Sequence, residues 1–353
     1  MIGYQRLVAE AARRNIPFEV SLELTHHCNF RCAHCYIPDF AAPDLLPTER
    51  LMTLLDELAA MGTLYLSFTG GELFLRRDWA SLGRRARTLG FFLTLLTNAS
   101  LIDEAVADII ADLPARVEVS MYSMDDEVFE RITGLRGSYR RTRRGIGLLR
   151  RRGVEVVLKT PIMTHNCGGI DAIAAWAEEI GADFMAFPSI VARKDGDLTP
   201  LRLRVPDEEL LAFFSGPHFG CSEPGHENRA DPDGGLCAAG SRYCNITPAG
   251  DVLACNILPG SAGNLRERTF REIWDHSPWL ARVRAIRQQD LPACRTCPAF
   301  SYCGRCAAQA LVEDGDILGP SAAACGRAAV VGNIRATRAV VGPAGDPAGD
   351  REG

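Results

Sequence analysis

The chain has 353 residues, of which 47% are hydrophobic and 24% are charged, and its formal net charge is −5. This length and composition suit a globular protein with one large core and a smaller second unit, and they give no support to a general nucleic-acid or membrane partner. The 13 cysteines are odd in number and lie at short spacings, and the N-terminus has no signal peptide, so we expect metal ligation in a reducing cytoplasm.

The chain opens with a predicted amphipathic helix over residues 1–14, followed by a strand over residues 17–25 with alternating apolar residues. The strand leads into Cys28-x3-Cys32-x2-Cys35 and then Tyr36. Three thiolates in one short loop can hold three corners of a cubane iron–sulfur cluster, which leaves one iron open for another ligand. The alternative is a zinc site completed by His26, His27 or His34.

This cysteine spacing, followed by an aromatic residue, resembles the signature of radical S-adenosylmethionine (SAM) enzymes. The residues that carry the resemblance are Cys28, Cys32, Cys35 and Tyr36. The resemblance implies a [4Fe-4S] cluster that binds SAM and cleaves it reductively. The resulting 5′-deoxyadenosyl radical abstracts hydrogen from the substrate.

A βα pattern follows an irregular segment at residues 37–47. Further strands are predicted over residues 63–69, 91–97, 115–121, 154–159 and 184–187. Helices are predicted over residues 48–61, 76–89, 101–112, 125–132, 138–152 and 169–180. Six strands that alternate with helices predict an α/β fold with a parallel sheet, either open or curled into a partial (β/α)6 barrel.

Unusual residues follow the ends of these strands, where parallel sheets collect their chemistry. They are Gly70, Gly71, Glu72, Asn98, Ser120, Tyr122 and Lys159. The two glycines let the backbone approach a ligand closely, and Glu72 can take the amino group of an amino-acid-like ligand. The alternative for each polar residue is ordinary hydrogen bonding at a strand end.

The family resemblance gives these residues expected roles. Gly70, Gly71 and Glu72 look like the motif that binds the methionine part of SAM. Asn98 and Ser120 are then candidates for the ribose and carboxylate side, and Lys159 for the carboxylate. Tyr122 is a candidate substrate contact or proton acceptor, with a core tyrosine as the alternative.

Residues 136–152 contain eight arginines. They form either a solvated helix face or a dock for an acidic partner, such as an electron donor or a leader peptide. We expect residues 1–195 to form the core, residues 196–236 to form a bridge and lid, and residues 342–353 to form a disordered tail. Cys167 and Cys221 are expected to be free thiols.

A second group of eight cysteines lies within residues 237–341. It comprises Cys237, Cys244, Cys255, Cys294, Cys297, Cys303, Cys306 and Cys325. Eight thiolates are the number that two fully ligated cubane clusters require, and zinc sites are the alternative. The pattern resembles the SPASM extension of radical SAM maturases, a small cysteine-rich α+β domain.

The SPASM resemblance divides these cysteines between two auxiliary clusters, which makes three [4Fe-4S] clusters in all. One set is Cys237, Cys244, Cys255 and Cys306, and the other is Cys294, Cys297, Cys303 and Cys325. It also implies a ribosomally made precursor peptide as substrate, which is crosslinked or oxidised while the auxiliary clusters accept an electron.

One expected partner is a ferredoxin- or flavodoxin-like electron donor. The other is a separate leader-peptide-binding protein, because the ~15 residues before the first strand are too few to form a leader-binding domain. The alternatives are a small-molecule radical SAM enzyme, such as a tetrapyrrole side-chain decarboxylase, and a non-catalytic iron–sulfur or zinc module. The intact cysteine motif together with Gly70, Gly71 and Glu72 argues against the last of these.

Overall fold

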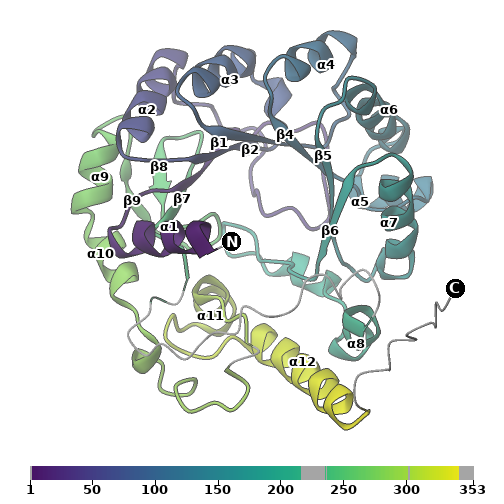
Figure 1. Cartoon of the computed structure of the whole chain (residues 1–353), viewed down its shortest axis with the longest axis vertical. Coiled ribbons are helices and arrows are strands. Elements are labelled where there is room, and N and C mark those ends of the chain that lie inside the picture. Colours follow the sequence, from purple (N-terminus) through teal and green to yellow (C-terminus); the bar gives the residue numbers. More distant parts are fainter. Residues whose placement is uncertain (1, 216–234, 236, 301–302, 342–353) are drawn as a thin grey trace, which may run out of the picture.

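The computed structural model describes residues 2–215, 235, 237–300 and 303–341 (Figure 1). Its strands are β1 (Glu19–Thr25), β2 (Tyr65–Gly70), β3 (Phe92–Thr97), β4 (Arg116–Ser120), β5 (Val156–Pro161), β6 (Asp183–Phe187), β7 (Tyr243–Ile246), β8 (Asp251–Leu253) and β9 (Ser261–Asn264).

The α-helices are α1 (Ile2–Arg13), α2 (Thr48–Ala60), α3 (Trp79–Thr88), α4 (Glu104–Ala111), α5 (Asp126–Thr133), α6 (Ser138–Arg151), α7 (Ile170–Glu179), α8 (Asp207–Ser215), α9 (Phe270–His276), α10 (Pro278–Ala285), α11 (Ala307–Asp314) and α12 (Ala322–Val341). Short 3₁₀ helices are η1 (Leu73–Leu75), η2 (Cys167–Gly169), η3 (Thr199–Leu203) and η4 (Gln288–Asp290).

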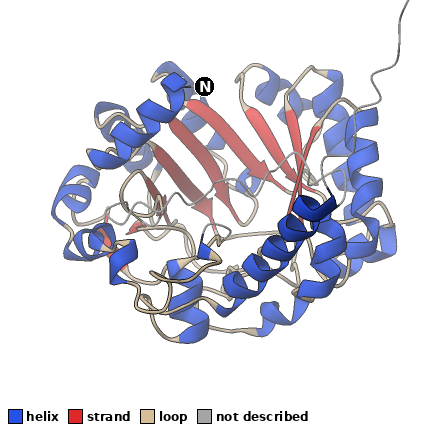
Figure 2. Ribbon diagram, turned by 60° about the horizontal axis from the view of Figure 1, so that its bottom comes forward, coloured by secondary structure: helices blue, strands red, loops and turns tan. Residues whose placement is uncertain are grey.

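The sheet confirms the predicted partial barrel. Strands β1 to β6 are hydrogen-bonded in chain order and are all parallel. Helices α2, α3, α4, α6 and α7 form an arc outside these strands, and Figure 2 shows the curved sheet inside the helical layer. The parallel arrangement brings the carboxyl ends of the strands to one rim, so the residues predicted at those ends share one side of the molecule.

The cysteine-rich region continues the core sheet. Strand β7 pairs in parallel with β1, with Leu22 opposite Ile246, and β8 and β9 then add antiparallel strands. A short turn joins β7 to β8, and the sequence pattern alone did not identify β1 as the partner of β7. The first cysteine loop and the second cysteine group are therefore joined through neighbouring strands of one sheet.

The side chains of β1 alternate between the two faces of the sheet. Val20, Leu22 and Leu24 are buried in the main hydrophobic core. On the outer side of the sheet, α2 buries its leucines at helical spacing, which are Leu51, Leu54, Leu55 and Leu58. Apolar side chains of the sheet and of α2 are thus buried, and this packing holds the strands whose carboxyl ends carry the functional residues.

The expected bridge contains more regular structure than predicted, since η3 and α8 lie within it and α8 packs against α12. The predicted lid, with Cys221, and the predicted tail over residues 342–353 lie outside the described residues. Within the described part of the chain, no helix is both long enough and apolar enough to cross a bilayer.

Candidate functional site

The first cysteine loop follows β1 and is held against α5. The backbone N–H of Arg31 donates to Thr133 O at 2.9 Å, and that of Ala33 donates to Ile132 O at 2.9 Å. Gly134 ends α5 in a left-handed conformation, and a Cβ there would lie 3.0 Å from Arg31 O. These contacts hold the loop backbone in a defined path along the end of α5.

The donor set of this loop fits a metal cluster. Cys28, Cys32 and Cys35 interact electrostatically with one another, and burial raises the pKa of Cys28 to about 11. Burial also raises the pKa of the Cys32 and Cys35 thiols. A bound metal deprotonates coordinating thiols outright, so a group of buried thiols at a strand end is suited to hold one.

Gly70 and Gly71 pack the end of β2 directly onto this loop. A Cβ on Gly70 would lie 2.1 Å from Thr25 O, and one on Gly71 would lie 2.3 Å from His27 O. The N–H of Gly71 donates to Thr25 O at 2.8 Å, and that of Glu72 donates to His27 O at 2.8 Å. In the structure, the close approach that these glycines allow is to the cysteine loop.

The structure places Glu72 just after the end of β2. Its side chain is fully buried, and its carboxylate accepts from Thr97 Oγ1 at 2.8 Å, from Asn98 N at 2.8 Å and from Phe74 N at 3.3 Å. Both carboxylate oxygens accept hydrogen bonds from protein, and the expected contact with a ligand amino group stays a prediction. Glu72 connects the end of β2 to the end of β3.

Burial raises the pKa of Glu72 to about 7, although its hydrogen-bond donors favour the ionised form. Because the folded-state pKa lies above the ordinary value of 4.5, the stabilisation is full at acidic pH and is lost as pH rises through about 7. We predict that the free energy of unfolding of the wild type, relative to Glu72→Gln, falls by about 3 kcal/mol between about pH 4.5 and about pH 8. Urea unfolding at the two pH values measures this difference, and parallel pH profiles would refute it.

Asn98 ties β3 to the cysteine loop. Its Nδ2 donates to Asn29 Oδ1 at 2.9 Å, and its Oδ1 accepts from Ser100 N at 2.9 Å and from Ser100 Oγ at 2.6 Å. The nitrogen and the oxygen of the carboxamide are therefore both hydrogen-bonded to protein. If Asn98 acts in SAM binding, it acts by holding the turn after β3 in place and not through a free side chain.

Lys159 and Ser120 lie opposite each other on β5 and β4. Lys159 Nζ donates to Glu118 Oε2 at 2.8 Å, and the Ser120 side chain hydrogen-bonds to Tyr122. The Lys159 ammonium, which was expected to bind the carboxylate of SAM, is therefore already paired with the carboxylate of Glu118. Ser120 keeps part of its surface exposed.

Tyr122 lies against the cysteine loop, not in an open substrate space. Its hydroxyl is 3.7 Å from Cys32 Sγ, and its ring meets the ring of His34 edge-on at 5.1 Å. Burial raises the pKa of Tyr122 well above its ordinary value, which is unfavourable for a proton acceptor. The position suits a group that packs on the loop.

Sequence reasoning missed a buried charged network beside Tyr36. The Glu23 carboxylate accepts from Lys194 Nζ at 2.7 Å and from Tyr36 Oη at 3.4 Å, and it lies 2.9 Å from His26 Nε2. Burial opposes ionisation of Glu23, but the bonds to His26 and Lys194 prevail and lower its pKa. The available signal was a carboxylate inside a predicted strand, two residues before the strand ends.

Three cysteines of the second group line one small cavity. Cys237, Cys255 and Cys306 interact electrostatically and border a space of about 60 Å³. Cys244 does not join them: it is fully buried on β7, packs in the main core and lies opposite Val20. A strand position directs this thiol into the core, and its expected role as a cluster ligand stays a prediction.

The four cysteines predicted to hold the second auxiliary cluster lie near one another in the structure. Cys294, Cys297, Cys303 and Cys325 all interact electrostatically, and Cys303 and Cys325 have raised pKa values because of burial. Within the described residues, no three His, Cys, Asp or Glu side chains are spaced to hold a single metal ion. A four-iron cluster spreads its thiolates over different irons and needs a wider arrangement. Cys167 lies apart on η2, near Glu209.

Comparison with protein families gives two matches. Residues 22–170 match the radical SAM superfamily, and residues 237–298 match the SPASM iron–sulfur cluster-binding domain. These ranges contain the first cysteine loop and the beginning of the second cysteine group.

Comparison with known proteins gives relatives over nearly the full chain. A PqqA peptide cyclase of Xanthomonas campestris pv. campestris (strain 8004) is 31% identical, over 94% of this chain and 93% of its own. An AdoMet-dependent heme synthase of Methanosarcina barkeri (strain Fusaro / DSM 804) is 27% identical, over 87% and 96% respectively. The crystal structure of Streptococcus suis SuiB bound to precursor peptide SuiA has the same fold, with a TM-score of 0.71, 17% identity, and coverage of 91% of this chain and 79% of SuiB.

Proposed function

The chain belongs to the radical SAM superfamily and carries a SPASM iron–sulfur domain, and we propose that this radical SAM enzyme acts on a ribosomally made precursor peptide. The observation that carries the proposal is the similarity to PqqA peptide cyclases over 94% of the chain, both regions included. The product is a crosslinked or oxidised peptide, and the reaction takes place in a reducing cytoplasm.

We assign the cofactor roles as follows. Cys28, Cys32 and Cys35 hold a [4Fe-4S] cluster whose open iron binds SAM, and Gly70 and Gly71 shape the rim beside it. When bound, the cluster and SAM supply a hydrogen-abstracting 5′-deoxyadenosyl radical. Glu72, Asn98 and Tyr122 position the loop, and Ser120 remains the candidate for a direct contact with SAM.

Two auxiliary [4Fe-4S] clusters complete the proposal. Cys237, Cys255 and Cys306 hold one, and its fourth ligand comes from outside the cysteines that line the cavity. A second set of four thiols, Cys294, Cys297, Cys303 and Cys325, holds the other. Their task is to accept the electron that the oxidised peptide leaves.

An acidic electron donor of the ferredoxin or flavodoxin type fits the basic surface beside the first loop. Arg31 and Arg136 are exposed there, and Arg140 and Arg141 are exposed in the first turn of α6. Arg31 Nη1 donates to Cys28 O at 2.7 Å. Since α5 and the turn before α6 pack on the loop, a partner on this surface lies close to the cluster site. A separate leader-peptide-binding protein is the second proposed partner.

We predict that Arg136→Glu/Arg140→Glu slows reduction of the enzyme by flavodoxin about tenfold or more at low salt, because like charges repel the donor. Reduction by dithionite, a small reagent, should keep its wild-type rate. The rates are measured from the loss of iron–sulfur absorbance. Equal slowing with both reductants would contradict this surface.

Tetrapyrrole decarboxylation is the second candidate, because the relative from Methanosarcina barkeri is a heme synthase. A substrate with several carboxylates needs cations to bind it. Among the rim residues described above, Lys159 is paired with Glu118 and Lys194 is paired with Glu23. These pairs favour the peptide candidate.

The test is co-expression of the enzyme with each short open reading frame beside its gene, followed by mass spectrometry of the peptides. Loss of a pair of hydrogen atoms from one peptide, and only with the intact cysteine loop, supports the proposal. Purified enzyme with SAM and dithionite that leaves every peptide unchanged but releases CO₂ from a propionate-bearing tetrapyrrole would refute it in favour of the second candidate.

A further inference from the structure

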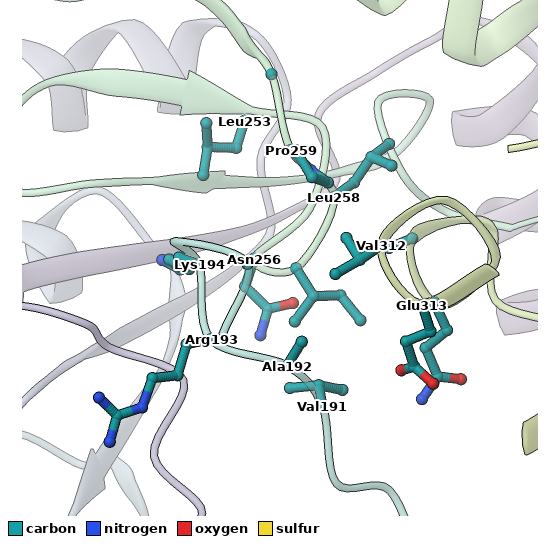
Figure 3. Close-up of a pocket in the computed structure, with 15 residues that line it drawn as sticks. Val191, Ala192, Arg193, Lys194, Leu253, Asn256, Leu258, Pro259, Val312 and Glu313 are labelled. Carbon is teal, nitrogen blue, oxygen red and sulfur yellow. The ribbon is translucent and has the colours of Figure 1, made fainter. Parts of the chain in front are cut away.

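A cavity lies between the core and the cysteine-rich region (Figure 3). Its volume is about 220 Å³. Three segments form its walls: residues 191–196 after β6, residues 253–260 around Cys255, and one face of α11. These segments are far apart in sequence, so the cavity exists only in the assembled fold.

The cavity lies between the two kinds of cysteine site. On one side, Lys194 donates to Glu23, and its backbone N–H donates to Tyr36 O at 2.9 Å, next to Cys35. On the other side, Asn256 and Leu258 directly follow Cys255, whose Sγ accepts from Leu258 N at 3.2 Å. An occupant would therefore lie beside both the first loop and the auxiliary thiols.

Two of the three charged residues of the cavity wall are hydrogen-bonded to an opposite charge, and the third points away from the space. Lys194 binds Glu23, and Glu313 binds Arg204 at 2.6 Å. Arg193 Nε lies 3.6 Å from Asp197 Oδ2 without a hydrogen bond, and its side chain extends away from Ala192 and Val312 in Figure 3. A charged group that entered this space would lose its hydration without gaining an unpaired partner, which is unfavourable.

The rest of the wall is mostly apolar, with one unengaged amide. The apolar wall residues include Val191, Ala192, Leu253, Ile257, Leu258 and Val312. Asn256 makes no hydrogen bond to any part of the chain that the structure describes, and its carboxamide points toward Ala192 in Figure 3. The space therefore offers apolar contact together with hydrogen bonding to one polar group.

We infer that this cavity receives one uncharged apolar side chain of the peptide substrate, aliphatic or aromatic, and that Asn256 hydrogen-bonds to the adjoining peptide group. The inference rests on the proposed function. The volume is below the roughly 300–1,000 Å³ of sites that enclose a whole drug-sized ligand, so it suits one residue and not a macrocycle. Asn256 and Ala192 are thereby specificity-determining residues.

The test uses capped amino acids as probes of the full-length reconstituted protein, without SAM or reductant. Saturation-transfer NMR compares N-acetyl-phenylalaninamide and N-acetyl-leucinamide with the corresponding aspartate and lysine derivatives. We expect at least tenfold weaker binding of the charged probes. Ala192→Leu, which fills the space, should remove the apolar signals, whereas Ala105→Leu on the exposed face of α4 should keep them.

A second variant guards against misfolding of the first. Asn256→Leu keeps the approximate side-chain volume and removes the hydrogen bond, so the affinity for N-acetyl-leucinamide should fall about three- to tenfold. Absence of binding to the wild type, equal binding of charged probes, or unchanged binding by both cavity variants would overturn the inference. Formation of 5′-deoxyadenosine by the wild type is measured separately, so a failure of the radical chemistry is distinguishable from a failure of this site.

Discussion

Gly71→Ala is expected to prevent assembly of the first cluster, although no ligand is changed. A Cβ at this position would lie 2.3 Å from His27 O and 2.6 Å from His26 O. Real Cβ atoms do not approach a carbonyl oxygen this closely, so the end of β2 or the cysteine loop must move. The hydrogen bond of 2.8 Å from Glu72 N to His27 O joins the same two segments, which makes the movement costly.

The expected result is a loss of about four irons per chain after anaerobic reconstitution, with a destabilisation of roughly 3 kcal/mol or more. Gly168→Ala is the matched control, because a Cβ there meets nothing within 4 Å. Iron and sulfide counts with circular-dichroism melting measure both effects. Wild-type iron content in Gly71→Ala would show that the glycine is not required by this contact.

Removal of the Glu23 carboxylate has the second large effect. Glu23→Ala leaves the Lys194 ammonium, whose side chain is only 17% exposed, without its carboxylate. Breaking one partner of a buried ion pair costs about 3–5 kcal/mol, because the remaining charge is uncompensated. We expect the free energy of unfolding in urea to fall by this amount. We also expect weaker SAM binding, because the same carboxylate accepts a hydrogen bond from Tyr36 beside the cysteine loop.

A double-mutant cycle tests whether the pair is the cause. Lys194→Met and Glu23→Gln should each destabilise, and the double variant should lose less than the sum of the two. Glu19→Gln is the control on the same strand, because its pair with Arg242 is more exposed and is worth about 1 kcal/mol or less. Additive effects of Glu23→Gln and Lys194→Met would mean that the network is not coupled through this pair.

The sequence pattern predicted the regular elements of the core well, because local periodicity determines them. The strand predicted over residues 91–97 is β3 at Phe92–Thr97, and the helix predicted over residues 48–61 is α2 at Thr48–Ala60. Glycines such as Gly62, whose φ is 88°, marked the helix end correctly. The placement of the first cysteine loop after β1 followed from the same alternation.

Local patterns could not predict which residues far apart in the sequence contact one another. Glu23 and Lys194 are 171 residues apart, and nothing local indicates that β7 pairs with β1. Cys244 was assigned by the resemblance to SPASM domains, and its position within a strand beside the core decides where the thiol lies. Glu72 was assigned by motif, and its burial could be seen only once β3 was in place.

The most direct test of the central claim compares the wild type with Cys28→Ala/Cys32→Ala/Cys35→Ala after anaerobic reconstitution, followed by incubation with SAM and dithionite. We predict about twelve irons per chain and 5′-deoxyadenosine for the wild type, and about eight irons and no 5′-deoxyadenosine for the variant. Zinc in place of iron, or 5′-deoxyadenosine formed equally by the variant, would contradict the assignment of this loop as the site of SAM cleavage.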